Sequence, residues 1–381
     1  MLNKILLISS LTKHEAHGVS LGFESLIDGF KLTNANIKII DTKGFLDSGN
    51  IGSFTLGRAI ASFRAVILAW AAIPSRETVY ITISLSQFGF IRDMLIILAA
   101  RLMRKRIILH LKGGGYDIFY YQQLVLFKYL ISFTLSLSTH IIVLGNLLCR
   151  QFDFITDIVD KIKIVPNGLT KDLHITTSSK ILPRKNQPIR ILYLSNLIPS
   201  KGYLTLLKAC IKLLNHSDIK FVCDYCGAFS KTIVDGNHTD AKKLEREFID
   251  LIKTNNLTNR VFYHGTVTGK VKEKMLSEAH IFILPTNYQW EGQPLSIIEA
   301  LAYSTPVIST PHRSIPEQIL EGENGFLIPP NDPDVLFKTI IKLVDDPVIY
   351  KKMSIAARVH FESNFKREVH LKKLIQIICN G

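Results

Sequence analysis

The chain has 381 residues, of which 47% are hydrophobic and 20% are charged. This length suits two domains, each with its own core, and this composition excludes extensive disorder. The formal net charge of +14 calls for an anionic partner, and nucleic acid, a membrane surface and an acidic substrate are the candidates.

The apolar segments do not predict a transmembrane helix. The nearest candidate, LVLFKYLISFTLSL at 124–137, is short and contains Lys128, so it predicts a buried helix. The N-terminal apolar run resembles a first strand and not a signal peptide. The cysteines are scattered, and Cys223 and Cys226 lie in a strand-end context. We therefore expect reduced, cytosolic thiols without a structural zinc or redox role.

Short β-rich runs alternate with helix-length segments along both halves of the chain. Amphipathic segments at 88–104 and 119–136 predict two of the helices. The strands of the first half are predicted at 4–9, 37–41, 78–84, 106–111, 140–144 and 161–165. Those of the second half are predicted at 189–194, 220–225, 260–265, 280–285, 305–309 and 325–330.

Such alternation predicts parallel sheets with helices on both faces. The polar, proline-containing stretch 176–188 marks the break between the halves. We expect an α/β chain of two doubly wound Rossmann-like domains, 1–180 and 181–360, facing a central cleft. Residues 361–381 are expected to form a C-terminal helix that crosses back to the first domain. Ligands of such sheets bind beyond the carboxyl ends of the strands.

The stretch EGQPLSIIE places Glu291 and Glu299 on either side of Pro294. Pro294 suits the first turn of a helix, whose N-terminal amides favour phosphate. Gly292 leaves room for a ligand to approach the backbone. Taken alone, the two acids are better explained by the helix dipole and by solvation than by hydroxyl binding.

The surrounding residues resemble the retaining family-four glycosyltransferases of GT-B fold. That family's Glu-x7-Glu pair and following strand correspond to NYQWEGQPLSIIEALAYSTPVIST (287–310), and its closing segment to IPEQILEGENGFLIPPNDPDVL (315–336). VPNGL (165–169), LSNLIPSKGYLTLLKA (194–209) and RVFYHGTVTGKVKEKMLSEAHIFILPT (260–286) match further family segments in order. The resemblance is strongest over residues 160–350.

The resemblance implies a donor site in the second half. Glu299 is expected to bind the nucleotide ribose, Glu291 the transferred sugar, and Lys201 the diphosphate. The other donor contacts implied are Gly292, Gln293, Pro294, Leu295 and Asn196. Asn196 stands where the family often has arginine, and Ser304 where it usually has glycine; the second change affects helix termination more than chemistry.

In the first half the resemblance implies fewer contacts. A flexible loop at 14–24 would bring Gly18 to the donor diphosphate, although a plain turn explains it equally well. The segment ILHLKGGGYDIFYY (108–121) resembles a histidine- and glycine-rich family loop. His110 is expected near the reacting carbon or the acceptor, with Lys112 and Tyr116 at the acceptor. Which of His110 and Lys112 serves the acceptor stays open, and so does a purely structural His110.

The implied function is retaining transfer of a hexosyl group from a nucleotide-sugar, with UDP as the expected nucleotide. The acceptor would be a saccharide or lipid-linked molecule in cell-surface polysaccharide or lipopolysaccharide synthesis. No cofactor and no metal are expected, because N-capping explains Asp332 and Asp334. A nucleotide-sugar epimerase and a non-catalytic sugar-binding relative are the alternatives.

The basic and apolar segments of the first half, 63–73, 90–106 and 119–133, predict association with an anionic membrane surface. Core helices of a doubly wound domain have the same composition, so packing is an equal alternative. Basic residues spread through helices do not favour nucleic acid as the partner. We expect a cytoplasmic protein, peripheral on the inner face of the cell membrane.

Overall fold

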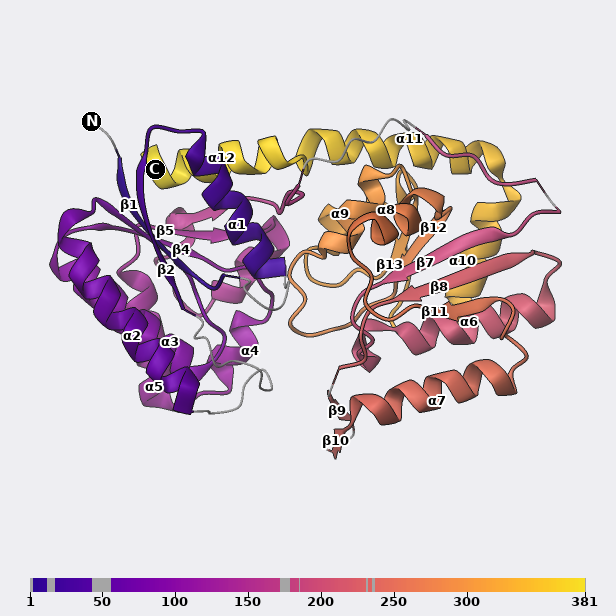
Figure 1. Cartoon of the computed structure of the whole chain (residues 1–381), viewed down its shortest axis with the longest axis horizontal. Coiled ribbons are helices and arrows are strands. Elements are labelled where there is room, and N and C mark those ends of the chain that lie inside the picture. The colour runs from indigo at the N-terminus through magenta and orange to yellow at the C-terminus, as the bar shows by residue number, and fades with distance from the viewer. Residues whose placement is uncertain are drawn as a thin grey trace. The chain divides into compact units, whose positions relative to one another are not determined.

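The protein divides into two compact units (Figure 1), seen here in a computed structural model. The structure describes residues 3–11, 18–42, 56–171, 179–184, 186–230, 232–234 and 237–380. Unit 1 comprises Met1–Asp172 and Lys366–Gly381, and unit 2 comprises Leu173–Phe365. The C-terminal segment thus belongs to the same unit as the N-terminus.

Unit 1 contains a parallel sheet of six strands in the order β2-β1-β3-β4-β5-β6. The strands are β1 (Lys4–Ser9), β2 (Asn36–Asp41), β3 (Thr78–Thr82), β4 (Arg106–His110), β5 (His140–Val143) and β6 (Ile162–Ile164). The order reverses between β1 and β3. In a doubly wound sheet this switch point opens a crevice at the carboxyl ends of the strands.

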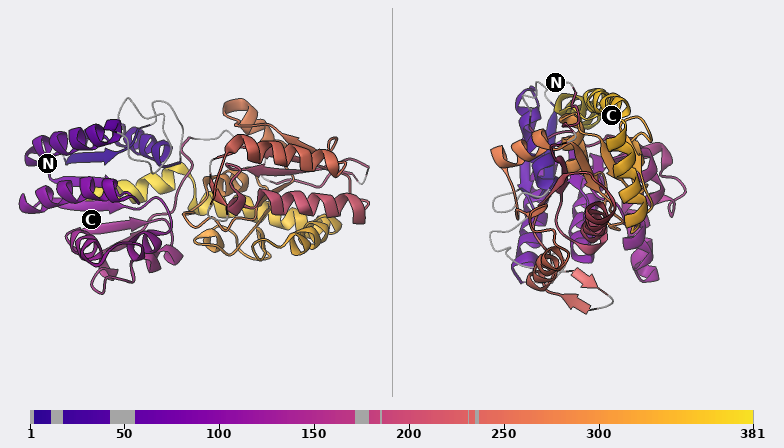
Figure 2. Two further views of the ribbon diagram at one scale, coloured as in Figure 1. Left: turned by 90° about the horizontal axis from the view of Figure 1, so that it is seen from below. Right: turned by 90° about the vertical axis from the view of Figure 1, so that its right-hand side faces the viewer.

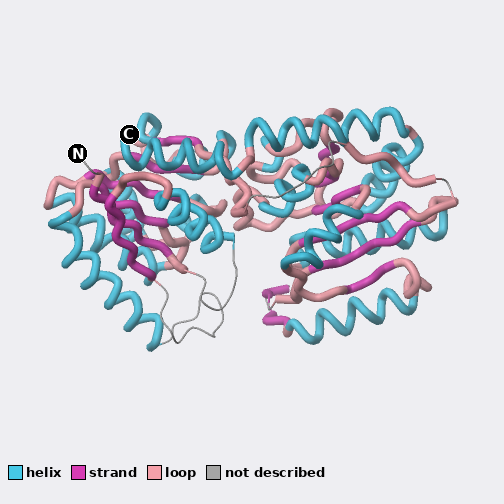
Figure 3. Tube along the Cα trace, turned by 45° about the horizontal axis from the view of Figure 1, so that its top comes forward, coloured by secondary structure: helices cyan, strands magenta, loops and turns pink. Residues whose placement is uncertain are grey.

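Helices cover the sheet of unit 1 on both faces (Figure 3). Helix α1 (Gly18–Lys31) and the C-terminal helix α12 (Arg367–Asn380) pack on one another and share a core with Tyr80 of β3 and Ile108 of β4. The remaining helices are α2 (Leu56–Ala72), α3 (Gln87–Leu102), α4 (Tyr116–Tyr121) and α5 (Val125–Ser136).

Two sequence-based expectations about unit 1 are wrong. The segment 119–136 is not one helix, because α4 ends at Tyr121 and α5 begins at Val125. The predicted loop 14–24 is helical from Gly18 onward; its residues 14–17 lie outside the described part of the chain. Gly18 is therefore the first residue of α1.

Unit 2 contains a second parallel sheet of six strands, in the order β11-β8-β7-β12-β13-β14. The strands are β7 (Ile189–Leu194), β8 (Phe221–Cys226), β11 (Val261–Tyr263), β12 (Ile281–Leu284), β13 (Val307–Ser309) and β14 (Gly325–Leu327). All twelve predicted strands are thus present, and the two doubly wound units confirm the predicted fold class. The antiparallel pair β9 (Thr232–Val234) and β10 (Asn237–Thr239), seen as two short arrows in Figure 2, was not predicted.

The helices of unit 2 include two packed pairs, α6 with α10 and α9 with α11. They are α6 (Tyr203–His216), α7 (Ala241–Thr254), α8 (Gly269–Glu278), α9 (Leu295–Ala302), α10 (Pro333–Asp345) and α11 (Pro347–Asn364). Asp332 caps α10 by accepting hydrogen bonds from the amides of Asp334 and Val335, which confirms the capping role predicted for it. Ser304 follows α9 in the left-handed conformation, φ 57°, where glycine is usual.

Within the described ranges, no helix has both the length and the apolar character needed to cross a membrane.

Candidate functional site

The switch point of the second sheet lies between β7 and β12, because β7 is followed in space by β8 on one side and by β12 on the other. The loop after β7 leads through Lys201 to α6, and the loop after β12 leads through Glu291 to α9. Both loops leave the carboxyl ends of neighbouring strands. The topology therefore brings the two segments singled out in the sequence to the position where such sheets bind ligands.

Two glycines allow the loop after β7 to approach its neighbours closely, Gly202 toward the end of β12 and Gly227 from the end of β8. Gly202, with φ 79°, lies where a Cβ atom would be 2.2 Å from the Pro285 carbonyl oxygen. Gly227, with φ 146°, lies where a Cβ would be 1.9 Å from the Ser195 carbonyl oxygen. Any other residue would force the loops apart. These close contacts fix the loop that carries Lys201 against the end of β12.

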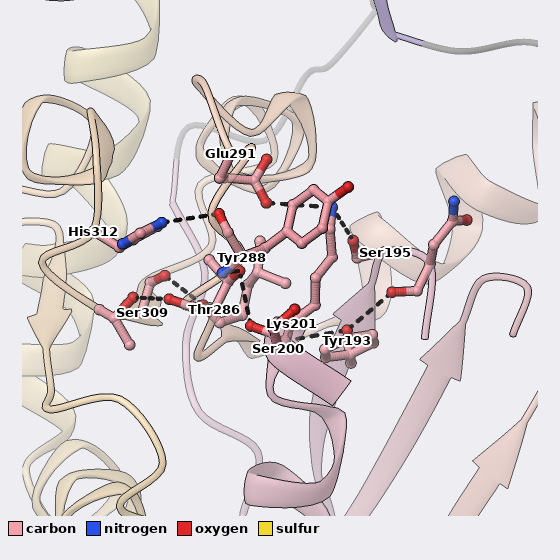
Figure 4. A network of polar contacts seen from close by, with 12 residues as sticks. Tyr193, Ser195, Ser200, Lys201, Thr286, Tyr288, Glu291, Ser309 and His312 are labelled. Atoms are coloured by element: carbon pink, nitrogen blue, oxygen red, sulfur yellow. Dashed lines mark hydrogen bonds and ion pairs between the residues drawn. The ribbon is translucent and has the colours of Figure 1, made fainter. Parts of the chain in front are cut away.

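Lys201 and Glu291 meet at this point (Figure 4). The Lys201 ammonium lies 3.2 Å from Glu291 Oε2 and donates a hydrogen bond of 3.1 Å to Ser195 Oγ. It also lies 5.1 Å from the centre of the Tyr288 ring. Glu291 Oε2 is buried and accepts no hydrogen bond, so its contact with Lys201 is an ion pair without hydrogen-bond geometry. The ammonium, with three N–H donors, keeps donors for an anionic ligand.

The carboxylate also affects the two tyrosines beside it. Burial, followed by the negative charge of Glu291, raises the pKa of Tyr193 and of Tyr288. Both phenols therefore stay protonated at neutral pH. Tyr193 uses its hydroxyl to hold the loop after β7, since Oη lies 3.3 Å from the Asn196 carbonyl oxygen. Asn196 itself is exposed, and its side chain is free to reach a ligand in solvent.

Hydrogen bonds from β13 and the loop after it brace the segment that carries Glu291 (Figure 4). His312 Nε2 lies 2.9 Å from the Tyr288 carbonyl oxygen, and the hydroxyl of Thr310 donates to the Thr286 carbonyl. Ser314 Oγ donates a bond of 2.6 Å to the Gly292 carbonyl oxygen. The sequence did not reveal these supporting residues. They hold Glu291 in place before any ligand arrives.

Helix α9 begins directly beyond this loop, with Pro294 at its N-cap. A proline side chain offers no capping oxygen, so the first amides of α9 point outward without a cap from this residue. Gln318 Nε2 donates a 3.0 Å bond to the Pro294 carbonyl and fixes the start of the helix. Gly292 and Gln293 are buried beside it, and Leu295, the first helical residue, is half-buried.

Glu299 lies in the second turn of α9 and pairs with a lysine that the sequence analysis did not single out. Lys272 Nζ on α8 donates a hydrogen bond of 2.6 Å to Glu299 Oε1. The carboxylate is partly exposed, with 18% of the side chain accessible. An ion pair leaves lone pairs on both oxygens, so the carboxylate keeps the capacity to accept hydrogen bonds from hydroxyl groups.

The site residues proposed for the first half of the chain lie in unit 1. His110 is the last residue of β4 and is fully buried, and the Lys112 ammonium is buried just beyond it. Tyr116 is 1% exposed, and its ring packs on Phe119, Phe152 and Phe154. This is the environment of a core side chain. Gly18 begins α1.

Within the described residues, no group of three or more His, Cys, Asp or Glu side chains is arranged to hold a metal ion. Cys223 and Cys226 are buried free thiols in β8.

Comparison with known proteins identifies the family. Residues 174–360, which include every element of the site in unit 2, match the family model described as "Glycosyl transferases group 1". Residues 174–360 form a group 1 glycosyl transferase domain. The chain is 28% identical over 203 residues to the amylovoran biosynthesis glycosyltransferase AmsK of Erwinia amylovora, and the matched region covers 52% of this chain and 46% of that protein. The chain spans less than two thirds of the length of the first curated relatives it matches.

Solved structures extend the likeness to the whole fold. HepE of Anabaena in complex with UDP superposes with a TM-score of 0.71 at 14% identity, covering 98% of this chain and 99% of HepE. The lipopolysaccharide outer core galactosyltransferase WaaB gives a TM-score of 0.70 at 15% identity, covering 98% and 99%. At this identity the likeness concerns the fold, and it places this chain among proteins of GT-B architecture.

Proposed function

We propose that this protein transfers a sugar from a nucleoside-diphosphate donor to a saccharide or lipid-linked acceptor during synthesis of a cell-surface polysaccharide or lipopolysaccharide. The observation that carries the proposal is the buried pair of Lys201 and Glu291 at the switch point of unit 2, next to the N-terminus of α9. A cation and outward-pointing amides suit a diphosphate, and carboxylates suit sugar hydroxyls.

In the proposed complex, Lys201 and the first amides of α9 bind the diphosphate. Glu291 accepts hydrogen bonds from the transferred sugar and Glu299 from the ribose. As the sugar–phosphate bond breaks, negative charge builds up on the departing nucleotide, and a fixed ammonium stabilises that charge more than it stabilises the intact donor. The proposed stereochemical course is retention, with the acceptor hydroxyl attacking on the face that the phosphate leaves and giving its proton to that phosphate.

The names of similar proteins support the choice of substrates. AmsK acts in amylovoran biosynthesis, WaaB is a galactosyltransferase of the lipopolysaccharide outer core, and HepE binds UDP. We accordingly propose a UDP-hexose as the donor, used without a metal ion.

Single substitutions in unit 2 test the proposal. Lys201→Met should weaken UDP binding about tenfold or more and lower the transfer rate about 100-fold, because one charged donor to the transition state is lost. Glu291→Gln should lower the rate while leaving UDP affinity nearly unchanged. Lys212→Met, which removes a lysine of α6 that pairs with Asp334 at the surface, is the control.

The assay is transfer from UDP-hexoses to a saccharide acceptor in the presence of EDTA, with the anomeric configuration of the product read by NMR. Wild-type rates in both Lys201→Met and Glu291→Gln would refute the assigned site. Isomerisation of the donor without acceptor would identify an epimerase instead.

We further propose that unit 1 associates peripherally with the anionic inner face of the cell membrane. Helix α2 exposes Phe63 and Trp70 on one face, and α5 exposes Leu126 and Tyr129. These two helices contain arginine and lysine but no acidic residue. Exposed apolar and aromatic side chains among positive charges are the composition of a surface that enters an anionic leaflet.

A further inference from the structure

Among the described residues, burial lowers the pKa of two lysines, Lys112 and Lys180, whose ammonium groups have opposite surroundings. Lys180, in unit 2, donates from its ammonium to the carbonyl oxygens of Leu276 and Ala279 and to Thr305 Oγ1, at 2.8, 2.6 and 2.8 Å. Lys112, in unit 1, has a buried ammonium with no hydrogen-bond partner. Burial lowers the pKa of each to about 7. Lys180 therefore has the contacts of a structural lysine, and Lys112 does not.

Lys112 lies one strand away from the switch point of the first sheet. It follows β4, whose neighbour β3 adjoins β1 at the point where the strand order reverses. Its ammonium lies over the beginning of α1, the helix that follows β1, since a Cβ atom placed on Gly22 would be 3.6 Å from Lys112 Nζ. Gly22 is one turn into α1, and it places no side chain between the helix and the Lys112 ammonium.

A second unused donor lies beside Lys112. His110 Nδ1 is 2.7 Å from the Tyr80 hydroxyl. Burial, the largest effect, raises the pKa of Tyr80, and a hydrogen bond with Thr82 opposes that rise. In one of the two neutral tautomers of His110, the Tyr80 hydroxyl donates to Nδ1. In that tautomer His110 Nε2 carries the hydrogen, and this buried atom also has no partner.

Among the described residues, the charges that act on His110 come from basic side chains. Burial lowers the pKa of His110 well below its ordinary value, and the nearby charges that add to this effect are those of Lys112 and His370. Burial also lowers the pKa of His370, on α12, to about 3, with Lys112 as the contributing charge. His370 Nδ1 is itself occupied, 2.6 Å from the Pro166 carbonyl oxygen. Buried donors without acceptors are costly, and a fold retains them where a ligand supplies the acceptor.

We propose that Lys112 Nζ, His110 Nε2 and the first turn of α1 bind an oxyanion, a phosphate or carboxylate, carried by the acceptor. This inference rests on the proposed function and narrows it to acceptors that are charged near the reacting hydroxyl. The acceptor is favoured over the donor as the source because the proposed diphosphate site, Lys201 with α9, lies wholly in unit 2.

Inorganic phosphate is the probe, added to the full-length protein at constant ionic strength with sodium chloride as reference. Thermal unfolding is followed as phosphate is raised. Phosphate should stabilise the wild-type protein and the control Lys31→Met, which removes an exposed lysine at the far end of α1. Lys112→Met should weaken phosphate binding about tenfold or more, because a charged hydrogen bond is lost. No effect of phosphate on the wild type would overturn the proposal.

Unfolding without phosphate separates binding from structure. Met fills the volume of Lys112 without an unpaired ammonium, so Lys112→Met should unfold at the wild-type temperature or above. Lys180→Met, which abandons three acceptors, should unfold at a clearly lower temperature. If Lys112→Met lowered the unfolding temperature as much as Lys180→Met does, Lys112 would be a structural lysine and the proposal would be overturned.

UDP binding distinguishes the two sources of the oxyanion. Lys112→Met should leave the UDP dissociation constant within about twofold, whereas Lys201→Met should raise it about tenfold. Equal weakening by both would assign Lys112 to the donor diphosphate and overturn the assignment to the acceptor. Failure of the wild type to bind UDP would refute the proposed function, and the phosphate series would still decide this site.

Discussion

His370 connects two parts of the chain that are distant in sequence. It lies on α12, and its ring nitrogen bonds the carbonyl of Pro166, 204 residues earlier. The ring is 4% exposed, and burial lowers its pKa to about 3. The folded protein therefore binds this proton much less readily than the unfolded chain, whose histidines titrate near pH 6.5. The contribution of His370 to stability is complete above about pH 6.5 and is lost as the pH falls toward 3.

His370→Asn tests this dependence, because asparagine keeps an N–H for the Pro166 carbonyl but does not titrate. Between pH 6.5 and pH 5 the wild type should lose about 2 kcal/mol more stability than the variant, at about 1.4 kcal/mol per pH unit. Urea unfolding at both pH values measures the difference. The exposed His216 gives the control variant His216→Asn. Parallel pH profiles of wild type and His370→Asn would contradict the expectation.

Residues of the candidate site could be predicted only where they follow a strand that is recognisable in the sequence. Lys201 and Glu291 each follow a recognisable strand, so their segments could be assigned to neighbouring strand ends, and the structure pairs them at 3.2 Å. Lys272 could not be found this way, because a lysine in the polar helix α8 looks like any surface lysine. His370 was equally hidden, since its partners Pro166 and Lys112 are distant in sequence.

At the level of elements, α1 contains two interior glycines, Gly22 and Gly29, in contrasting surroundings. A Cβ on Gly22 would meet only Lys112, at 3.6 Å. A Cβ on Gly29 would lie 3.1 Å from Leu371 and 3.2 Å from Ile375, both on α12. Alanine favours a helix over glycine by about 1 kcal/mol. Gly22→Ala should therefore raise the free energy of unfolding by about 1 kcal/mol. Gly29→Ala should lower the free energy of unfolding, because the new methyl group crowds α12.

We expect Gly29→Ala to be less stable than Gly22→Ala by about 1 to 3 kcal/mol. Urea denaturation of the two variants measures this, and the shared substitution makes each the control for the other. Equal stabilities would show that α12 moves away from α1 without cost.

Elements were predictable where local composition decides them, and not where tertiary contacts do. The β-branched runs of both sheets gave all twelve strands. The break between α4 and α5 contains no glycine or proline, so the sequence did not predict it. There Gln123 donates to the Phe119 carbonyl and accepts a hydrogen bond from Gln87 of α3, so packing partners distant in sequence end the helix.

For the whole molecule, the membrane proposal accounts for the excess of basic residues, and a vesicle-binding assay tests it. Phe63 is 68% exposed on α2 and Leu126 is 72% exposed on α5. Phe63→Glu combined with Leu126→Glu should weaken binding to vesicles containing phosphatidylglycerol about tenfold or more, because apolar burial is replaced by repulsion. Co-flotation with vesicles measures binding.

The matched control is Val348→Glu, which places the same charge at an exposed apolar position of α11 in unit 2. It should float with anionic vesicles as the wild type does. Wild-type protein that stays free of such vesicles at low salt would end the membrane proposal.

The membership of α12 in unit 1 has a consequence for how the protein is made. Leu371, Leu374 and Ile378 complete a core whose other members lie before residue 166. On the ribosome, the N-terminal sheet therefore emerges early but waits for α12 until the whole of unit 2 has been synthesised. The intervening unit has all of its own strands by then, so the half that begins first is the half that matures last.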